Sequence, residues 1–362
     1  MRYNEIRRHT RAVQVGRVTL GGSAPIAIQS MTNTDTHDVA ATLAQVRALE
    51  TAGCDIVRLT VPDLAAADTI LALKKAGVSV PLVADIHFDY RVAVACAERG
   101  VDKIRINPGN IGGKENVRAV VRACVAHHVP IRIGVNGGSL EKHILAKYGA
   151  PTAEALTESA LYHAKMLEEL DFYDTVISLK ASDVSTMIAA NRMLAQQCAY
   201  PLHLGVTEAG DAEMGSIKSA IGIGALLSDG IGDTVRVSLT ADPVEEIGAA
   251  RRILSALAVE GQAGLNIVSC PTCGRTKIDL ISLSAQFRAA VEREGLSDLP
   301  LRVALMGCAV NGPGEAREAD IGICGGDGEA LLIAKGEILR KIPEADVIAV
   351  LIAELKKRKD TV

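Results

Sequence analysis

Residues 81–109 read PLVADIHFDYRVAVACAERGVDKIRINPG, and this stretch decides the fold. Short apolar runs at 81–88 and 103–108 lie on either side of an alanine-rich amphipathic stretch at 90–100. A strand, a helix and a second strand in this order are typical of parallel strands joined by a crossover helix. The stretch therefore predicts one βα repeat and the strand of the next.

The same alternation runs from residue 25 to residue 259. It predicts eight strands, at 25–31, 56–61, 81–88, 103–108, 130–136, 175–181, 201–207 and 234–239. Each strand is followed by a helical stretch, at 38–53, 64–77, 90–100, 115–128, 153–170, 183–199, 212–228 and 243–259. Eight such repeats predict an α/β fold, a (β/α)8 TIM barrel. A doubly wound open sheet is the alternative, but it rarely needs eight repeats, and no glycine-rich phosphate turn follows the first strand.

Two further segments flank the repeats. Residues 11–22 predict a small hairpin that plugs the floor of the barrel. Gly261 to Gly264 predict a linker, after which strand-like and helix-like runs indicate a smaller α/β domain. That domain has strand-like runs at 266–270, 302–307, 319–324 and 330–334 and helical runs at 279–294 and 343–358. We therefore expect a substrate-binding barrel domain at 1–260 and a second domain at 261–362.

Composition excludes several classes of protein. The 362 residues contain no Trp and 2% aromatic residues, so the stacking platforms of single-stranded nucleic-acid binders are missing. A net charge of −4 gives no general attraction for polyanions. The sequence has neither a signal peptide at its start nor an uninterrupted apolar run of about 18 residues, so we expect a cytoplasmic protein that binds no membrane.

Polar side chains follow the predicted strands at their carboxyl ends, where the catalytic groups of a barrel lie. Five of these side chains are cations, namely Arg58, Arg105, Arg132, Lys180 and Arg236. Their polar neighbours at the strand ends are Thr60, Asp85, His87, Asn107, Asn136, Ser182, Thr207, Glu208 and Ser238. A single barrel arginine is more often paired with a neighbouring strand than with a ligand. Five cations around one mouth are different, because Asp85 and Glu208 neutralise only two of them. We expect a highly anionic small ligand, such as a diphosphate, held by bidentate guanidinium contacts.

The cysteines fall into two groups. Cys54, Cys96, Cys124 and Cys198 are scattered singly through apolar segments and are expected in the core. Cys270 and Cys273 form a C-x-x-C pair, and Cys308 lies in a second glycine-rich segment. In a chain without a secretion signal these three are typical of metal ligands. The fourth ligand could be Cys324, a carboxylate such as Glu315, or substrate. Such pairs also occur in zinc knuckles and redox disulfides, but three thiols without a second C-x-x-C favour an iron–sulfur centre.

Six segments together resemble the 4-hydroxy-3-methylbut-2-enyl diphosphate synthase family of the non-mevalonate isoprenoid pathway, in its two-domain bacterial form. They are residues 29–36, 104–110, 132–136, 207–210, 270–275 and 311–315. The resemblance extends from about residue 5 to residue 358. It implies that the second domain is a sulfite-reductase-like iron–sulfur domain.

The resemblance implies a chemistry. Members of the family open 2-C-methyl-D-erythritol 2,4-cyclodiphosphate reductively, with loss of water. They use a [4Fe-4S] cluster held by three cysteines and one glutamate, which fall here on Cys270, Cys273, Cys308 and Glu315. Reduced flavodoxin or ferredoxin supplies the electrons. The diphosphate-binding residues fall on the five cations, with Asn107, Asn136 and Ser238 as neighbours.

Two expectations concern catalysis and assembly. We expect Glu208 to donate a proton to the departing hydroxyl, with His87 as the second candidate. The chain leaves its eighth helix near residue 259, at the floor of the barrel, and a linker of about five residues spans at most roughly 18 Å. Barrel helices of about 24 Å would keep the cluster from its own mouth. We therefore expect a homodimer in which the cysteine domain of one subunit caps the barrel of the other.

Two other functions fit part of the sequence. One is a zinc-bearing, phosphate-handling barrel enzyme without redox chemistry, such as an aldolase or a relative of the pterin synthases. The other is an iron–sulfur or zinc sensor that binds a partner or nucleic acid, which the low aromatic content and negative charge disfavour.

Overall fold

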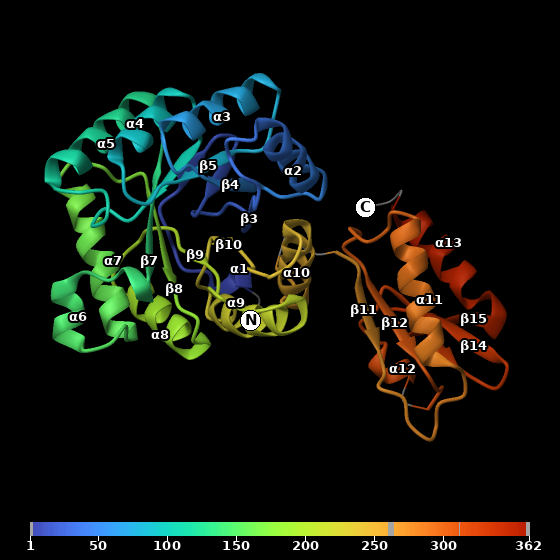
Figure 1. Ribbon diagram of the computed structural model, residues 1–362. Coiled ribbons are helices and arrows are strands. Elements are labelled where there is room, and N and C mark those ends of the chain that lie inside the picture. Colours follow the sequence, from blue (N-terminus) through green and yellow to red (C-terminus); the bar gives the residue numbers. More distant parts are fainter. Residues whose placement is uncertain (1–2, 260–263, 311, 360–362) are drawn as a thin grey trace. The chain divides into compact units, whose positions relative to one another are not determined.

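The computed structural model describes residues 3–259, 264–310 and 312–359. The chain divides into two compact units, residues 1–260 and 261–362 (Figure 1). Most of the predicted linker, 261–263, lies outside the described residues.

The first unit is the predicted barrel. Its eight parallel strands follow the order β8-β7-β6-β5-β4-β3-β10-β9. A parallel bridge between Ile177 and Leu202 joins the two ends of this order and closes the ring. The strands are β3 (Ala27–Met31), β4 (Ile56–Thr60), β5 (Leu82–Asp85), β6 (Lys103–Ile106), β7 (Ile131–Asn136), β8 (Thr175–Lys180), β9 (His203–Leu204) and β10 (Thr234–Val235). All eight predicted strands are confirmed, although β9 and β10 are much shorter than expected.

An N-terminal hairpin closes the floor of the barrel, as the sequence predicted. Strands β1 (Val13–Val15) and β2 (Val18–Leu20) pair antiparallel. Val13, Val15 and Leu20 form one buried apolar cluster with residues at the starts of the barrel strands, namely Ala27, Ile56, Val83 and Val176. Burial of these aliphatic side chains excludes water from the floor.

Eight helices surround the strands (Figure 1). They are α2 (Val39–Thr51), α3 (Leu64–Lys75), α4 (Tyr90–Glu98), α5 (Lys114–His127), α7 (Ala153–Glu168), α8 (Val184–Ala195), α9 (Ala212–Ser228) and α10 (Pro243–Ala256). Six begin with an aspartate whose carboxylate accepts a backbone N–H of the first turn, namely Asp38, Asp63, Asp89, Asp183, Asp211 and Asp242. Such caps satisfy backbone donors that a helix leaves free. They fix the point at which each loop of the mouth turns into its helix.

Three short elements of the barrel unit were not predicted from the sequence. A 3-10 turn, η1 (Gly137–Ser139), and α6 (Lys142–Tyr148) extend the connection between β7 and α7. A further helix, α1 (Tyr3–Ile6), precedes the hairpin. Each is too short to give a periodic apolar pattern, which is the signal on which helix prediction depends.

The second unit is a five-stranded sheet with helices. Its strands are β11 (Asn266–Ser269), β12 (Arg302–Met306), β13 (Ile321–Gly325), β14 (Glu329–Ala334) and β15 (Glu337–Pro343), hydrogen-bonded in that order. The first three are parallel, and the last two continue antiparallel. Its helices are α11 (Leu280–Arg293), α12 (Gly312–Glu315) and α13 (Val347–Lys359). Phe287 of α11 and Leu351 of α13 pack in its own apolar core.

No helix within the described residues is long and apolar enough to cross a membrane.

Candidate active site

The register of the strands sorts the inward side chains of the barrel into layers of four, each taken from alternate strands. Upward from the floor, one layer holds Gln29, Val83, Arg132 and His203. The next layer holds Arg58, Arg105, Ser178 and Arg236, and the third holds Met31, Asp85, Gly134 and Gly205. Thr60, Asn107, Lys180 and Ser238 follow toward the mouth. The predicted cations therefore occupy successive layers of one column.

Two glycines make room for this charge. A Cβ atom at Gly134 would lie 2.2 Å from Nε of Arg105, and one at Gly205 would lie 2.9 Å from Nζ of Lys180. The two cationic side chains thus fill space that larger residues would take. Replacement of either glycine would displace a cation from the barrel axis.

Asp85 neutralises part of the charge. Its carboxylate accepts a hydrogen bond of 2.9 Å from Nη1 of Arg105 and lies 3.6 Å from Nε of Arg58. Burial by itself raises the pKa of Asp85, but Arg58, Arg105 and Arg132 outweigh burial and hold it at about 2. Asp85 is therefore ionised and shared by two arginines.

Glu246 of α10 is the second neutralising carboxylate, and the sequence analysis missed it. Its two oxygens accept from Nε and Nη2 of Arg236 at 3.1 and 2.8 Å, and Ser30 donates to it at 2.8 Å. Nη1 of Arg236 donates to Ser238 at 2.6 Å. Glu208, which we expected to share this task, is exposed and forms no ion pair within the described residues. That part of the expectation was wrong, because Glu208 lies beyond the last layer.

Arg132 and Lys180 form no ion pair with any other residue that the structure describes. Arg132 is 1% exposed, and Nη1 donates to Ser178 at 3.2 Å, while Nε and Nη2 have no partner among the described residues. Lys180 is 6% exposed. Burial, followed by the neighbouring arginines, lowers the pKa of both groups. An arginine does not give up its proton in a protein, so the column carries net positive charge and is suited to bind an anion.

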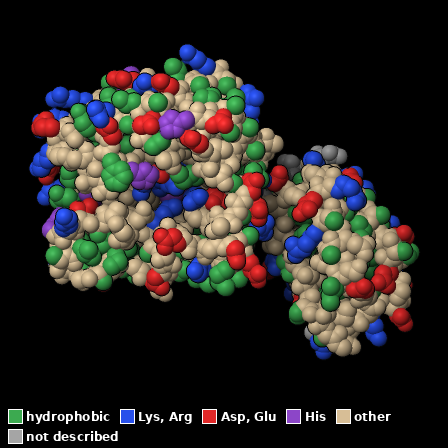
Figure 2. Space-filling model, viewed as in Figure 1, with side chains coloured by type: hydrophobic (Ala, Val, Ile, Leu, Met, Phe, Trp, Pro, Cys, Tyr) green, Lys and Arg blue, Asp and Glu red, His purple; other side chains and the backbone are tan. Residues whose placement is uncertain are grey.

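The residues at the rim are mostly neutral. Nδ2 of Asn107 donates to the carbonyl oxygen of Ser139 at 3.2 Å, and Ser139 in turn caps the backbone of Asn136. With its amide oriented to satisfy both of its ends, Asn136 accepts from Nη2 of Arg105 at 3.3 Å. In Figure 2, Lys and Arg side chains are visible within a hollow on the barrel unit.

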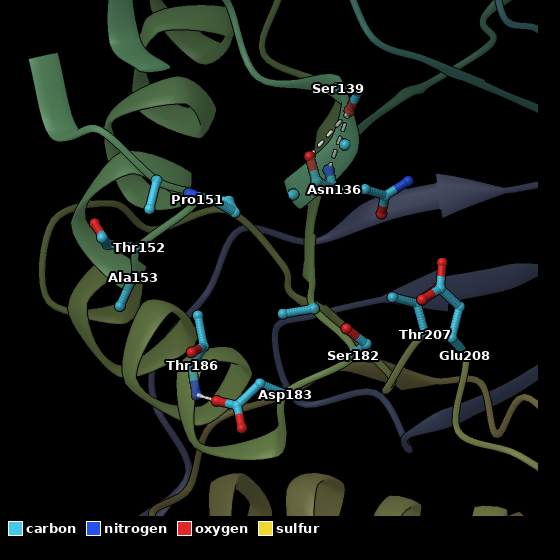
Figure 3. A pocket seen from close by; sticks show the side chains of 14 residues that line it. Asn136, Ser139, Pro151, Thr152, Ala153, Ser182, Asp183, Thr186, Thr207 and Glu208 are labelled. Atoms are coloured by element: carbon cyan, nitrogen blue, oxygen red, sulfur yellow. Dashed lines mark hydrogen bonds between the residues drawn. The ribbon is translucent and has the colours of Figure 1, made fainter. Parts of the chain in front are cut away.

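A pocket of about 790 Å³ opens beside this rim. Asn136, Thr207 and Glu208 lie on one side of it, and Thr152, Asp183 and Thr186 lie on the other (Figure 3). Glu208 adopts the left-handed conformation with φ of 53°, which is uncommon for a side chain of this size. Strained backbone of this kind is common at functional sites, where it directs a side chain. His87 is exposed, and its charge helps to lower the pKa of Asp85, so it lies close to the column.

Two buried polar side chains deeper in the barrel were not predicted. Lys103 opens β6, is fully buried, and its Nζ has no partner among the described residues. His203 of β9 is likewise buried, and Nε2 has no partner in the described part of the chain. Burial, and then the charge of Arg132, lowers the pKa of each. Lys103 precedes Arg105 by two residues, and this spacing could have revealed that its side chain also points inward.

We expect Lys103→Met to stabilise the protein by roughly 1–3 kcal/mol at pH 7, because it removes a buried amine that has no partner. The pKa of this amine is lowered in the folded protein and returns to the ordinary lysine value of 10.5 in the unfolded chain. At pH 7, unfolding is therefore accompanied by the uptake of a proton. The destabilisation of the folded state caused by Lys103 should therefore decrease as the pH rises from 7 toward 10. Urea unfolding at both pH values measures it. Exposed Lys75→Met is the matched control and should change stability little; a destabilised Lys103→Met would contradict the assignment.

The cysteines gather at one edge of the second sheet. Cys270 follows β11, and Cys308 follows β12, its parallel neighbour, so both loops leave the sheet at the same edge. The backbone N–H of Gly307 donates to Sγ of Cys270 at 3.3 Å. Thr272, between Cys270 and Cys273, has a φ of 65°, which forms the tight turn of the C-x-x-C pair. None of the three cysteines forms a disulfide with another described residue, and all three are at least partly exposed.

Glu315 and Cys324 differ in accessibility. Glu315 ends α12 and is exposed. Cys324 lies within β13, fully buried, and a Cβ at Gly312 would come within 2.6 Å of its Sγ. Burial, and then the charges of Cys308, Glu315 and Cys270, raises the pKa of Cys324 to about 12. These three side chains therefore lie around Cys324, although no three His, Cys, Asp or Glu side chains in the described residues stand close enough to bind one metal ion.

Comparison with known proteins agrees with both units. The model of the GcpE TIM-barrel domain matches residues 10–251, and that of the GcpE protein C-terminal domain matches residues 266–357. The chain is 56% identical to 4-hydroxy-3-methylbut-2-en-1-yl diphosphate synthase (flavodoxin) of Ruminiclostridium cellulolyticum, over 97% of this chain and 98% of the relative. It is also 56% identical to the protein of the same name from Listeria monocytogenes, over 98% and 94%.

Solved structures show the fold alone. Type I 3-dehydroquinate dehydratase from Clostridium difficile has a TM-score of 0.51 at 15% identity, covering 68% of this chain and 98% of that one. N-acetylneuraminic acid synthetase from Leptospira borgpetersenii has a TM-score of 0.50 at 10% identity, covering 79% and 99%. The family models, by contrast, account for nearly the whole sequence in two consecutive segments. The chain belongs to the GcpE family.

Proposed function

We propose that this chain reduces 2-C-methyl-D-erythritol 2,4-cyclodiphosphate to (E)-4-hydroxy-3-methylbut-2-enyl diphosphate in isoprenoid biosynthesis. Two electrons and one proton enter, the ring C–O bond breaks, and a hydroxyl leaves as water. The observation that carries the proposal is the column of five cations in the barrel, with which only Asp85 and Glu246 form ion pairs among the described residues. The relatives' name supports this product.

The barrel residues, 1–260, would bind the substrate. Arg58, Arg105, Arg132, Lys180 and Arg236 surround the diphosphate in this proposal. Asp85 already orients the guanidinium groups of Arg58 and Arg105, and Glu246 orients that of Arg236. Asn107, Asn136, Thr207 and Ser238 would donate or accept at the rim. Such preorganisation lowers the entropy lost on binding.

The second unit, residues 261–362, would carry a [4Fe-4S] cluster on Cys270, Cys273, Cys308 and Glu315. The donor set fits the group: three cysteines that form no disulfide with a described residue lie at one sheet edge, and Sγ of Cys270 already accepts a backbone N–H bond. Buried Cys324 fits less well as a fourth ligand than exposed Glu315. Because the side chains do not converge as they stand, the two loops would close around the cluster. The bound cluster would supply electrons one at a time.

Reduced flavodoxin is the electron donor we propose, on the name of the relatives. Ferredoxin remains the alternative, and the cytoplasmic location remains a prediction. The relatives support neither the zinc enzyme nor the sensor.

Anaerobic chemistry tests the function. Purified, reconstituted protein should contain about four iron and four sulfide per chain and should reduce the cyclodiphosphate with a chemical one-electron donor. A colourless zinc protein without turnover would reject the proposal, whereas a coloured protein without turnover would indicate a sensor.

Charge removal tests the anion site. Arg58→Ala, Arg105→Ala and Arg132→Ala should each lower kcat/KM roughly tenfold to hundredfold, because a buried charge-assisted contact contributes about 1.5–3 kcal/mol. Iron content should stay at the wild-type value. Arg118→Ala, on the exposed face of α5, is the control. Wild-type kcat/KM in all three variants would place the diphosphate elsewhere.

Glu208 is our candidate for the proton donor to the departing hydroxyl. Glu208→Gln should lower kcat by about a hundredfold or more and change KM little, because general acids commonly contribute factors of that size. His87→Asn serves as the comparison. If Glu208→Gln turns over normally while His87→Asn does not, the second candidate carries the role.

We also infer an active site shared between two subunits. Helix α10 ends at Ala256 and β11 begins at Asn266, so residues 257–265 connect them. Fully extended, these nine residues reach about 30 Å, and the roughly 21 Å of α10 takes up most of this reach before the loops of the mouth are added. Because the helix ends at the floor, a cluster held on the second unit is supplied more simply to the mouth of a partner's barrel.

A further inference from the structure

A carboxylate outside the cation column anchors the connection between β7 and α7 to helix α7 itself. Glu141 lies between η1 and α6, and both of its oxygens contact α7. Oε1 lies 2.5 Å from Nε2 of His163, and Oε2 accepts from Ser159 at 2.7 Å. The His163 side chain is fully buried, and that of Glu141 is 12% exposed.

This Glu141–His163 pair packs against the loop after β6. A Cβ atom at Gly109 would lie 3.0 Å from Cε1 of His163 and 3.1 Å from Oε1 of Glu141. The backbone N–H of Gly109 donates to Oδ1 of Asn107 at 3.0 Å. The pair therefore packs directly against the turn that orients the Asn107 amide.

The other end of the Asn107 amide leads to Asn136. Nδ2 of Asn107 donates to the carbonyl oxygen of Ser139 at 3.2 Å. Oγ of Ser139 accepts from N of Asn136 at 3.3 Å and donates to its carbonyl oxygen at 3.1 Å. Glu141 follows Ser139 by two residues, so anchoring Glu141 also anchors the turn that carries Ser139.

The charge of Glu141 strengthens the anchor. Burial raises its pKa, but the hydrogen bonds from His163 and Ser159 outweigh burial and bring it to about 2. An ionised acceptor makes shorter and stronger hydrogen bonds than a neutral one. The contact is also largely withdrawn from solvent, so salt screens it weakly.

We propose that Glu141 and His163 are positioning residues that fix the amides of Asn107 and Asn136 for substrate. This inference rests on the proposed function, in which both amides contact the substrate. Neither Glu141 nor His163 reaches the cation column. Their effect is on the geometry of the rim and therefore on substrate affinity.

Glu141→Gln keeps the shape of the side chain and removes its charge. In the reconstituted enzyme we expect KM for the cyclodiphosphate to rise about tenfold, with kcat within about twofold and unchanged iron content, because uniform binding is lost. Ser159→Ala removes one bond only and should raise KM by a smaller factor, which keeps the test open if Glu141→Gln folds poorly. Wild-type KM in both variants overturns the inference.

The matched control is Glu158→Gln. Glu158 also ties α6 to α7, through Lys147 at 2.6 Å and Tyr148 at 2.7 Å, but on the outer side and away from Gly109. Its KM should stay near that of the wild type. An equal rise would show that any loosening of α6 has the same effect, and would overturn the positioning role.

A double-mutant cycle with Asn107→Ala separates this inference from the proposed site. If the pair acts through Asn107, adding Glu141→Gln to Asn107→Ala should raise KM by less than about twofold further. Multiplying effects would mean that the pair acts independently of Asn107, and the inference fails. A wild-type KM in Asn107→Ala alone would instead remove Asn107 from the binding site and so defeat the premise.

Discussion

Replacement of Cys270, Cys273 or Cys308 by serine will remove the visible absorbance of the reconstituted protein and reduce its turnover to background. A serine oxygen is a poor substitute for a thiolate on iron, and each of these thiols stands on a loop at the same sheet edge. Iron and sulfide analysis together with the anaerobic assay measures both losses. The folded state should persist, since none of the three is fully buried in the core of the second unit.

Cys324→Ala is the matched control for this series. Its thiol is buried within β13, so removal leaves a small cavity but takes away no accessible donor. We expect most of the cluster and activity to remain. Glu315→Ala should lower both. Loss of the cluster in Cys324→Ala with retention in Glu315→Ala would reverse the assignment of the fourth ligand.

Mixing two impaired chains should restore activity if the site is shared between subunits. Arg58→Ala impairs the barrel, and Cys270→Ser impairs the cluster, so each homodimer lacks an intact pair. In a heterodimer one of the two composite sites combines an intact barrel with an intact cluster, which gives roughly half of the wild-type activity per heterodimer.

Subunit exchange has to be demonstrated independently, for example by native mass spectrometry of differently tagged chains. Full activity of a species with monomeric mass would contradict the shared site. So would proven exchange without any recovery.

The barrel was predictable because the local sequence of each βα repeat contains the signals for its strand and its helix. In residues 81–109 an apolar strand, an aspartate cap and an amphipathic helix all agree, and β5, α4 and β6 follow that pattern. The positions of the cations at strand ends followed from the same register. The prediction of an anion site needed only their number and their common face.

Other features depended on tertiary contacts that a local pattern does not contain. Glu246 reaches Arg236 from a helix, so no strand pattern pointed to it. Lys103 was passed over because it stands at the start of its strand, far from the mouth. Strand β15 lies at the edge of its sheet and has five exposed residues in succession, among them Ile338 and Leu339. It therefore lacks the alternation expected of a half-buried strand. Cys324, the last residue of the strand predicted at 319–324, is the fourth residue of β13.

The apolar plug formed by β1 and β2 closes one end of the barrel and leaves its mouth as the entrance for ligands. The substrate would enter and the product would leave through the same opening, because Val13, Val15 and Leu20 close the opposite end of the barrel. Both molecules are diphosphates. In the dimer proposed above, the partner's second domain, which would cover this opening to deliver electrons, would have to move away in every cycle before the product leaves. The rate at which this domain moves away would then limit kcat, and tighter association of the two chains would lower kcat.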